Sequence, residues 1–152
     1  MGNTTKNGLI SQTAVLNRLV QLGYEVLLPW SPDSGYDLAY YVEKEEHHFG
    51  FFIHTESQLV RVQCKTAWLV KDGAALMFNT STVSTGGADV WKKKKSGYRN
   101  RADWFGVYSL NTGKVYMISV WDAPDASDMI LRLTPPKNNQ SRGVKWAKDY
   151  EL

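Results

Sequence analysis

The feature that most constrains the fold of this chain is a strict alternation of residue types between Leu59 and Thr66. Successive side chains of a β-strand point to opposite faces of a sheet. One face of this segment is typical of a core and carries Val60, Val62, Cys64 and Thr66. The opposite face is polar and carries Arg61, Gln63 and Lys65. The pattern predicts a half-buried strand, within a longer strand over 59–70, on which Gln63 and Lys65 point the same way.

The remainder of the chain predicts one early helix followed mainly by strands. A helical pattern runs from Gly8 to Leu22 after a polar start at 1–7, and Gly23 suits a helix C-cap. Its predicted buried stripe carries Leu9, Leu16, Leu19 and Val20. Further strands are expected at 24–28, 36–42, 49–55, 74–79, 104–109, 114–120 and 129–133, with a charged connection at 43–48, a long loop at 80–103 and a short helix at 144–152. We therefore expect an α+β fold with a mostly antiparallel sheet.

Length and composition narrow the class of protein. A chain of 152 residues favours a single domain over 1–152, and 43% hydrophobic residues supply a real core. One cysteine excludes a disulfide framework and a thiolate zinc site. No apolar run has the length of a membrane span, and the start does not resemble a secretory signal. We expect a cytoplasmic protein that does not contact a membrane.

The positive charge is concentrated in one stretch. The formal charge of +3 hides a net −2 over residues 1–76 and a net +5 over 77–152. Six cations and no acid lie between 92 and 101, namely Lys92, Lys93, Lys94, Lys95, Arg99 and Arg101. A solvated lysine loop is the ordinary interpretation. The alternative is a patch that binds phosphates, which the neighbouring aromatic residues Trp91, Tyr98 and Trp104 favour.

Two further residues attract attention beside the polar face of the 59–70 strand. Asp37 opens a predicted strand directly after a Pro- and Gly-containing turn, and Gln12 lies on the apolar stripe of the helix. Each has an ordinary explanation, since Asp suits turns and a helix amide can bond to backbone. Their order along the chain, a helix residue, then Asp37, then Gln63 and Lys65, is more informative than any one of them.

In this order the chain resembles the PD-(D/E)XK nuclease superfamily, and more closely its group I intron-encoded homing endonucleases. The resemblance covers most of the chain. It is carried by Gly8-Leu9-Ile10-Ser11-Gln12, Gly23-Tyr24-Glu25-Val26 with Pro29, Tyr36-Asp37-Leu38, Arg61-Val62-Gln63-Cys64-Lys65-Thr66-Ala67, Gly97-Tyr98, Asp103-Trp104-Phe105-Gly106-Val107-Tyr108, Val115-Tyr116 and Asn138-Asn139-Gln140.

The resemblance implies a restriction-endonuclease-like core of αβββαβ type and Mg²⁺-dependent hydrolysis of DNA phosphodiesters. It implies a catalytic set of Gln12, Asp37, Gln63 and Lys65 at the end of the sheet. The expected metal ligands are the Asp37 carboxylate, the side chain of Gln12 and the Cys64 backbone carbonyl. Lys65 is expected to orient the attacking water. Relatives carry glutamate at the position of Gln12. We therefore expect a weakened or inactivated form that retains binding.

The leading hypothesis is a site-specific endonuclease of the homing type acting on double-stranded DNA. Lys92, Lys93, Lys94 and Lys95 would hold phosphates, and Arg99 and Arg101 would read bases. Cutting both strands needs two sites, so a homodimer or homotetramer is expected. A structure-selective resolvase and a non-catalytic DNA-binding module remain alternatives. A metal site at His47, His48 and His54 is disfavoured, because adjacent histidines beside Glu45 and Glu46 are typical of a solvated turn.

Overall fold

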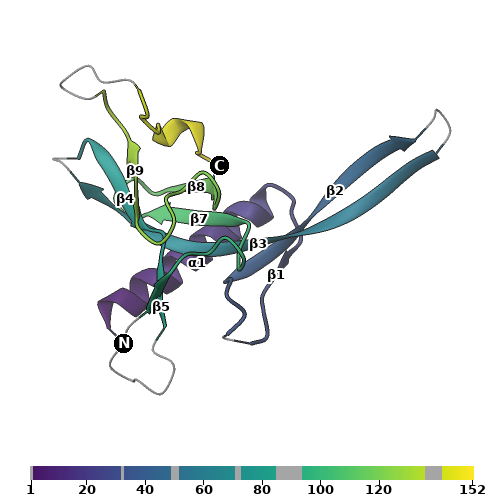
Figure 1. Ribbon diagram of the computed structural model, residues 1–152, viewed down its shortest axis with the longest axis horizontal. Coiled ribbons are helices and arrows are strands. Elements are labelled where there is room, and N and C mark those ends of the chain that lie inside the picture. The colour runs from purple at the N-terminus through teal and green to yellow at the C-terminus, as the bar shows by residue number, and fades with distance from the viewer. Residues whose placement is uncertain (1, 32, 49–51, 71–72, 85–93, 136–141) are drawn as a thin grey trace.

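A single long helix packs across a twisted, sheet-dominated body in the computed structural model of the protein (Figure 1). The structure describes residues 2–31, 33–48, 52–70, 73–84, 94–135 and 142–152. The elements in chain order are α1 (Asn3–Gln21), β1 (Val26–Leu27), β2 (Leu38–His48), β3 (Phe52–Val70), β4 (Ala75–Asn79), β5 (Thr82–Ser84), β6 (Lys94–Ser96), β7 (Trp104–Ser109), β8 (Lys114–Ser119), β9 (Asp128–Arg132) and a 3₁₀ turn (Ala147–Asp149). Neither helical element in the described ranges is long and apolar enough to cross a membrane.

The central strand of the main sheet is β3, which pairs with three neighbours. The strand order of this sheet is β1-β2-β3-β4-β9. In addition, β7 pairs with β3, and β8 pairs with β7. The pairing of β3 with β7 is parallel, and the other pairs of this sheet are antiparallel. The prediction of an α+β fold with a mixed, mostly antiparallel sheet is confirmed.

A long two-stranded arm extends from the body (Figure 1). The antiparallel ladder of β2 and β3 runs without interruption from Leu38 opposite Val62 to His48 opposite Phe52. The predicted charged connection at 43–48 is therefore wrong, because these residues continue β2. Of the separate strands expected at 49–55 and 59–70, residues 52–55 and 59–70 belong to the one strand β3, and residues 49–51 lie outside the described ranges. Pairing with a partner strand outweighs the low β-propensity of glutamate and lysine here.

The helix differs from its prediction in both extent and buried face. It begins at Asn3 rather than Gly8, so the start of the chain is ordered into α1. The buried residues are Ser11, Val15 and Leu19, whereas Leu9 and Val20 of the predicted stripe are exposed. The polar Ser11 is buried because its hydroxyl hydrogen-bonds the Thr66 hydroxyl of β3 at 2.6 Å. This tertiary contact rotates the helix relative to the orientation that hydrophobicity alone predicts.

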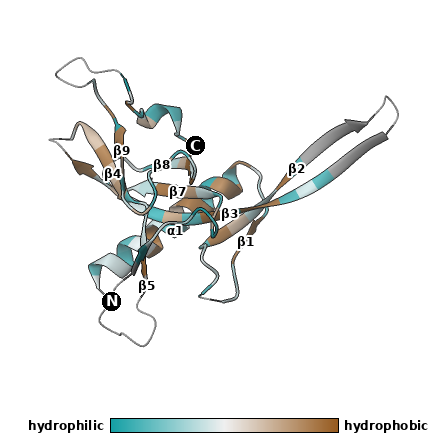
Figure 2. Ribbon diagram, in the orientation of Figure 1, coloured by the Kyte–Doolittle hydropathy of each residue, from teal (hydrophilic) through white to brown (hydrophobic). Residues whose placement is uncertain are grey.

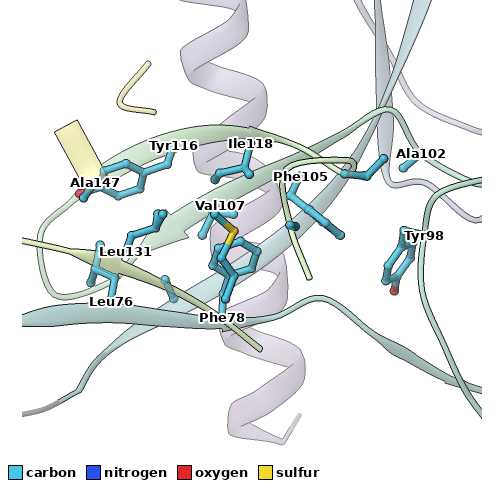
Figure 3. Close-up of a cluster of buried hydrophobic side chains, with 14 residues drawn as sticks. Leu76, Phe78, Tyr98, Ala102, Phe105, Val107, Tyr116, Ile118, Leu131 and Ala147 are labelled. Atoms are coloured by element: carbon cyan, nitrogen blue, oxygen red, sulfur yellow. The ribbon is translucent and has the colours of Figure 1, made fainter. Parts of the chain in front are cut away.

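Two apolar cores lie on the two faces of the sheet. Val15 and Leu19 of α1 pack with Val62 and Cys64 of β3 on one face. The larger core on the other face contains Leu76, Phe78, Tyr98, Ala102, Phe105, Val107, Tyr116, Ile118, Leu131 and Ala147 (Figure 3). Hydrophobic residues correspondingly mark β4, β7 and β9, whereas α1 alternates between hydrophobic and hydrophilic positions (Figure 2).

Gly106 in β7 allows the helix to approach the sheet closely. A Cβ at this position would lie 2.6 Å from a Val15 methyl and 2.9 Å from a Val62 methyl. Both contacts are closer than packed carbon atoms tolerate, so a larger residue would push α1 away from β3. The position of α1 matters because this helix carries Gln12.

The connection from β4 to β7 differs from the predicted loop at 80–103. Residues 82–84 and 94–96 form the antiparallel pair β5 and β6, so the basic stretch contains a strand. The second helix of the expected αβββαβ pattern is not found in the described parts of this connection, 80–84 and 94–103. At the C-terminus, the helix expected at 144–152 is only the 3₁₀ turn Ala147–Asp149.

Candidate active site

Asp37 lies immediately before β2, where its backbone N–H donates to the Val62 carbonyl of β3 at 2.9 Å. Its carboxylate oxygen Oδ2 accepts two hydrogen bonds from β3. One comes from the Cys64 backbone N–H at 2.7 Å, and the other comes from the Gln63 side-chain amide. The start of β2 and the middle of β3 thus place the sequence-predicted Asp37 and Gln63 in direct contact.

Gln12 joins this pair from α1. Its side-chain amide nitrogen donates to the backbone carbonyl of Asp37 at 3.1 Å. The fixed position of Ser11 against Thr66 determines which side of the helix Gln12 occupies. Gln12 is therefore an amide bonded to backbone, as its ordinary interpretation has it, and the backbone that it contacts is that of Asp37.

The Asp37 carboxyl is held in an unusual electrostatic environment. Burial raises the pKa of Asp37 above its ordinary value, because desolvation disfavours the charged form. The Cys64 N–H, the positive charge of Lys65 and the Gln63 amide oppose this rise without cancelling it. A divalent cation would favour the ionised carboxylate, so the arrangement suits a group that becomes charged when a cation is bound.

Lys65 shares the polar face of β3 with Gln63, and its ammonium group has two partners. Nζ donates to the Ser81 carbonyl at 3.2 Å and to the Tyr98 hydroxyl at 3.2 Å. Ser81 is itself held by Asn79, whose Oδ1 accepts from the Ser81 N–H at 2.8 Å and from its hydroxyl at 2.7 Å. Sequence reasoning missed Ser81 as a partner of Lys65. It used Tyr98 as an aromatic neighbour of the basic stretch and as part of the family resemblance, but not as a partner of Lys65.

Cys64 contributes backbone rather than sulfur to this site. Its side chain is buried among the residues that face α1. Burial, and then the negative charge of Asp37, raise the pKa of the Cys64 thiol well above its ordinary value. The thiol therefore stays protonated at neutral pH, and the contact of Cys64 with Asp37 runs through its N–H.

A cleft of about 370 Å³ opens beside Asp37. Its walls are formed by Gln12, Leu28, Pro29, Ser31, Tyr36 and Asp37. None of these residues is a cation, and Leu28, Pro29 and Tyr36 give the cleft an apolar side. Trp30, in the same loop, is fully exposed. The Pro, Gly, Ser and Asp residues of this loop predict a turn, but they do not predict a cleft.

The basic residues predicted to bind nucleic acid do not form one continuous loop. Arg101 packs against Gly35 in the turn that leads to Asp37, where a Cβ on Gly35 would lie 2.7 Å from Arg101 Nε. Arg99 is exposed and lies 5.3 Å from the ring centroid of Trp121. Lys95 is exposed in β6, only the backbone of Lys94 is described, and Lys92 and Lys93 lie outside the described residues.

One cation on the polar face of β3 is already paired. Arg61 forms a two-pronged ion pair with Asp103, with Nη2 to Oδ1 at 2.9 Å and Nε to Oδ2 at 3.1 Å. The Arg61 hydrogen bond is the largest cause that lowers the pKa of Asp103. The Arg61 backbone N–H also donates to Asp103. This pair lies where the ladder between β3 and β7 begins, next to Val62 opposite Trp104, and sequence reasoning did not anticipate it.

The site offers few protein ligands to a hard divalent cation. Within the ranges that the structure describes, three His, Cys, Asp or Glu side chains do not come together in a cluster. Asp37 supplies one carboxylate, and Gln12 and Gln63 supply amide groups beside it. Mg²⁺ prefers oxygen ligands, retains several waters and is commonly bound through one or two carboxylates plus substrate phosphates. The site therefore suits a cation whose remaining ligands are water and a phosphodiester.

Comparisons with known proteins show the family and the fold of the chain. The model of the PD-(D/E)XK endonuclease family matches residues 2–152. Among solved structures, the bacterial homing endonuclease I-Ssp6803I is similar, with a TM-score of 0.68 and 21% sequence identity over 99% of this chain and 89% of that one. That likeness shows a shared fold. A search of curated proteins returned no match. Because the family model spans almost the whole chain, the chain belongs to the PD-(D/E)XK endonuclease family.

Proposed function

We propose that this chain is a site-specific endonuclease of the homing type that hydrolyses phosphodiester bonds of double-stranded DNA with Mg²⁺. The observation that carries the proposal is the meeting of Gln12, Asp37 and Gln63 where β2 begins beside the middle of β3, with the Lys65 ammonium close enough to act on the Asp37 charge. An acid, two amides and a lysine in this arrangement suit metal-assisted phosphodiester hydrolysis. The proposal includes a single endonuclease domain over 1–152 and an origin in a group I intron.

Each residue has a defined task in this proposal. Asp37, the Gln12 side chain and the Cys64 backbone carbonyl would hold Mg²⁺, which when bound polarises the scissile phosphate. Gln63 holds the Asp37 carboxylate in place through its hydrogen bond. Lys65 orients the attacking water and counters negative charge that develops on the phosphate. The raised pKa of Asp37 makes metal binding favour higher pH, because the carboxyl must lose its proton first.

The amide of Gln12 supports a weakened form of the enzyme. A glutamate at this position would add a second carboxylate, whereas Gln12 brings no charge and uses its N–H on the Asp37 carbonyl. A site with one carboxylate binds a divalent cation less strongly than a site with two, since each carboxylate adds a full negative charge. The proposed activity is therefore lower than that of a form with glutamate at position 12, while DNA binding is retained.

DNA recognition is assigned to the basic stretch. Lys92, Lys93, Lys94 and Lys95 would hold backbone phosphates, whereas Arg99 and Arg101 would contact base edges. The contact of Arg101 with Gly35 supports a place for Arg101 close to the scissile bond, since Gly35 is two residues from Asp37. We propose a homodimer or homotetramer, because one site cuts one strand at a time.

Cleavage assays on two substrates test the function. The chain and its Gln12→Glu form are incubated with random duplex DNA and with a four-way junction, in Mg²⁺ or in EDTA. We expect Mg²⁺-dependent duplex cutting that is stronger in the Gln12→Glu form and absent in Lys65→Ala. Cutting confined to the junction would indicate a resolvase. DNA binding without cutting by any form would indicate a non-catalytic binding module.

A further inference from the structure

We propose that Tyr98 is a positioning residue that holds the Lys65 ammonium group in its working place, and that it thereby links the basic segment to the hydrolytic site. The inference rests on the proposed function for its effect on cleavage, but the contact itself can be tested without cleavage. Nothing in the proposed roles of Gln12, Asp37, Gln63 and Lys65 requires a tyrosine. The structure nevertheless places one against the lysine.

The contact has two components. The Tyr98 hydroxyl accepts a hydrogen bond from Lys65 Nζ at 3.2 Å, and Nζ lies 4.5 Å from the centroid of the Tyr98 ring. The Ser81 carbonyl accepts a second hydrogen bond from Nζ. An ammonium group has three N–H donors, so these contacts occupy two and leave one for a water or a phosphate oxygen. A lysine side chain is flexible and has many rotamers. The hydrogen bonds to Tyr98 and Ser81 select one of them.

Tyr98 is itself rigidly held, which a positioning residue requires. It is buried in the larger core, where its ring meets the edge of Phe105 with centroids 5.6 Å apart and planes at 85° (Figure 3). Its backbone carbonyl accepts from the N–H groups of Arg101 at 2.8 Å and Ala102 at 3.0 Å. The preceding Gly97 fits closely against Asp125, so the backbone has little room to shift.

The same turn carries the residues assigned to DNA contact. Arg99 follows Tyr98 directly and is exposed, and Arg101 reaches Gly35 beside Asp37. The turn that would make these DNA contacts therefore also fixes the position of the Tyr98 hydroxyl that accepts from Lys65. Tyr98 connects phosphate or base contact at Arg99 and Arg101 with the orientation of the lysine that faces the scissile phosphate.

The test compares Tyr98→Phe with a matched control, Tyr116→Phe. The first change removes only the hydroxyl and keeps the ring on Phe105. The second also removes the hydroxyl of a buried tyrosine, whose side-chain partner is Thr112 and which makes no contact with Lys65 in the part of the chain that the structure describes. Cleavage is followed under single-turnover conditions in the Gln12→Glu background, and DNA affinity is measured in EDTA. In parallel, acylation of each lysine by an N-hydroxysuccinimide ester is read by peptide mass spectrometry, with Lys6 and Lys148 as internal references.

We expect Tyr98→Phe to lower the single-turnover rate about 10-fold, the size of one hydrogen bond to a charged group, with unchanged DNA affinity. Lys65 should acylate faster in Tyr98→Phe than in Tyr116→Phe, while Lys6 and Lys148 keep their rates. Equal Lys65 acylation in the two variants would overturn the inference. Normal cleavage by Tyr98→Phe, with cleavage lost in Lys65→Ala, would also overturn it and leave the proposed function standing. Faster Lys65 acylation with no cleavage by any form would support the contact and reject the proposed function.

Discussion

The side-chain amide of Gln12 donates its hydrogen bond to the backbone carbonyl of Asp37, 3.1 Å away, and not to the Asp37 carboxylate. A glutamate in its place has no donor when ionised, so it could not make this contact. This hydrogen bond therefore holds α1 to the turn before β2. In the proposed site, a glutamate at position 12 would instead place a second carboxylate there, facing the cation. Gln12 contributes to the folded structure by the same feature that reduces the charge of the site.

The Gln12→Glu variant is expected to exchange stability for cation binding. Loss of the bond to the Asp37 carbonyl and the approach of two carboxylates should lower Tm in EDTA, because like charges repel. Added Mg²⁺ should raise the Tm of this variant more than it raises that of the unchanged chain, since ligand binding stabilises the folded state. Thermal unfolding across a Mg²⁺ titration measures both effects. Equal Mg²⁺ responses in the two forms would contradict the assignment of position 12 to the metal site.

Asp37→Asn should abolish cleavage without destabilising the fold. Burial raises the pKa of Asp37, so its ionised form opposes folding at pH values above that pKa. An asparagine oxygen can still accept from the Cys64 N–H, and it removes the buried charge. At pH 7 the Tm of the variant should equal or exceed that of the unchanged chain in EDTA. As pH falls below the raised pKa, the two Tm values should converge, and a Tm well below the unchanged chain at pH 7 would contradict this account.

The Arg61–Asp103 pair predicts the opposite pH dependence. Its hydrogen bonds lower the pKa of Asp103, so the ionised carboxylate stabilises the fold above its unfolded-state pKa, and that stability is lost as pH falls through the lowered pKa. Asp103→Asn should reduce the free energy of unfolding at pH 7 by no more than about 1 kcal/mol, because both side chains are partly exposed. The deficit should shrink as pH falls toward the lowered pKa in urea denaturation. A deficit of the same size at acidic and neutral pH would show that geometry rather than charge is responsible.

Ser11→Ala should loosen the attachment of α1 to β3. The Ser11 hydroxyl is fully buried and bonds to the Thr66 hydroxyl, so its removal should cost about 1–2 kcal/mol of unfolding free energy. Thr13→Ala is the matched control, since Thr13 also loses a hydroxyl hydrogen bond but lies on the exposed side of the same helix. Urea denaturation of both variants measures the difference. Equal losses would show that the buried pair has no special part in docking the helix.

Trp30→Ala should weaken DNA binding without changing the stability of the fold. Trp30 is fully exposed in the loop that lines the cleft beside Asp37, where the proposed function would place a base or sugar next to the scissile phosphate. Stacking on an aromatic side chain contributes about 1–3 kcal/mol per base. Fluorescence anisotropy of labelled DNA in EDTA measures the loss of affinity. Trp68→Ala serves as the control, because Trp68 is also exposed but lies where β3 pairs with β4, and an equal loss there would exclude a specific part for Trp30.

Features that depend on neighbouring residues could be predicted from the amino-acid order. The alternation over 59–66 predicted that Gln63 and Lys65 share one face of a strand, and this follows from strand geometry alone. The same local patterns predicted the α+β class, most strand positions and the turn at 30–35 that precedes Asp37. Local patterns could not predict the length of the arm, because the pairing of 43–48 depends on a partner strand rather than on propensity.

Which side chains contact one another depends on how distant segments of the chain pack together. The bond between Gln12 and Asp37 spans 25 residues, and the bond between Lys65 and Tyr98 spans 33. The buried face predicted for α1 is wrong because of a contact between residues 55 positions apart. The hydroxyls of Ser11 and Thr66 hydrogen-bond to each other, so the polar Ser11 can occupy the buried face of the helix. The periodicity of apolar residues predicts a buried face from hydrophobicity alone. Burial of two distant polar groups is offset by their hydrogen bond only when the fold brings both groups together.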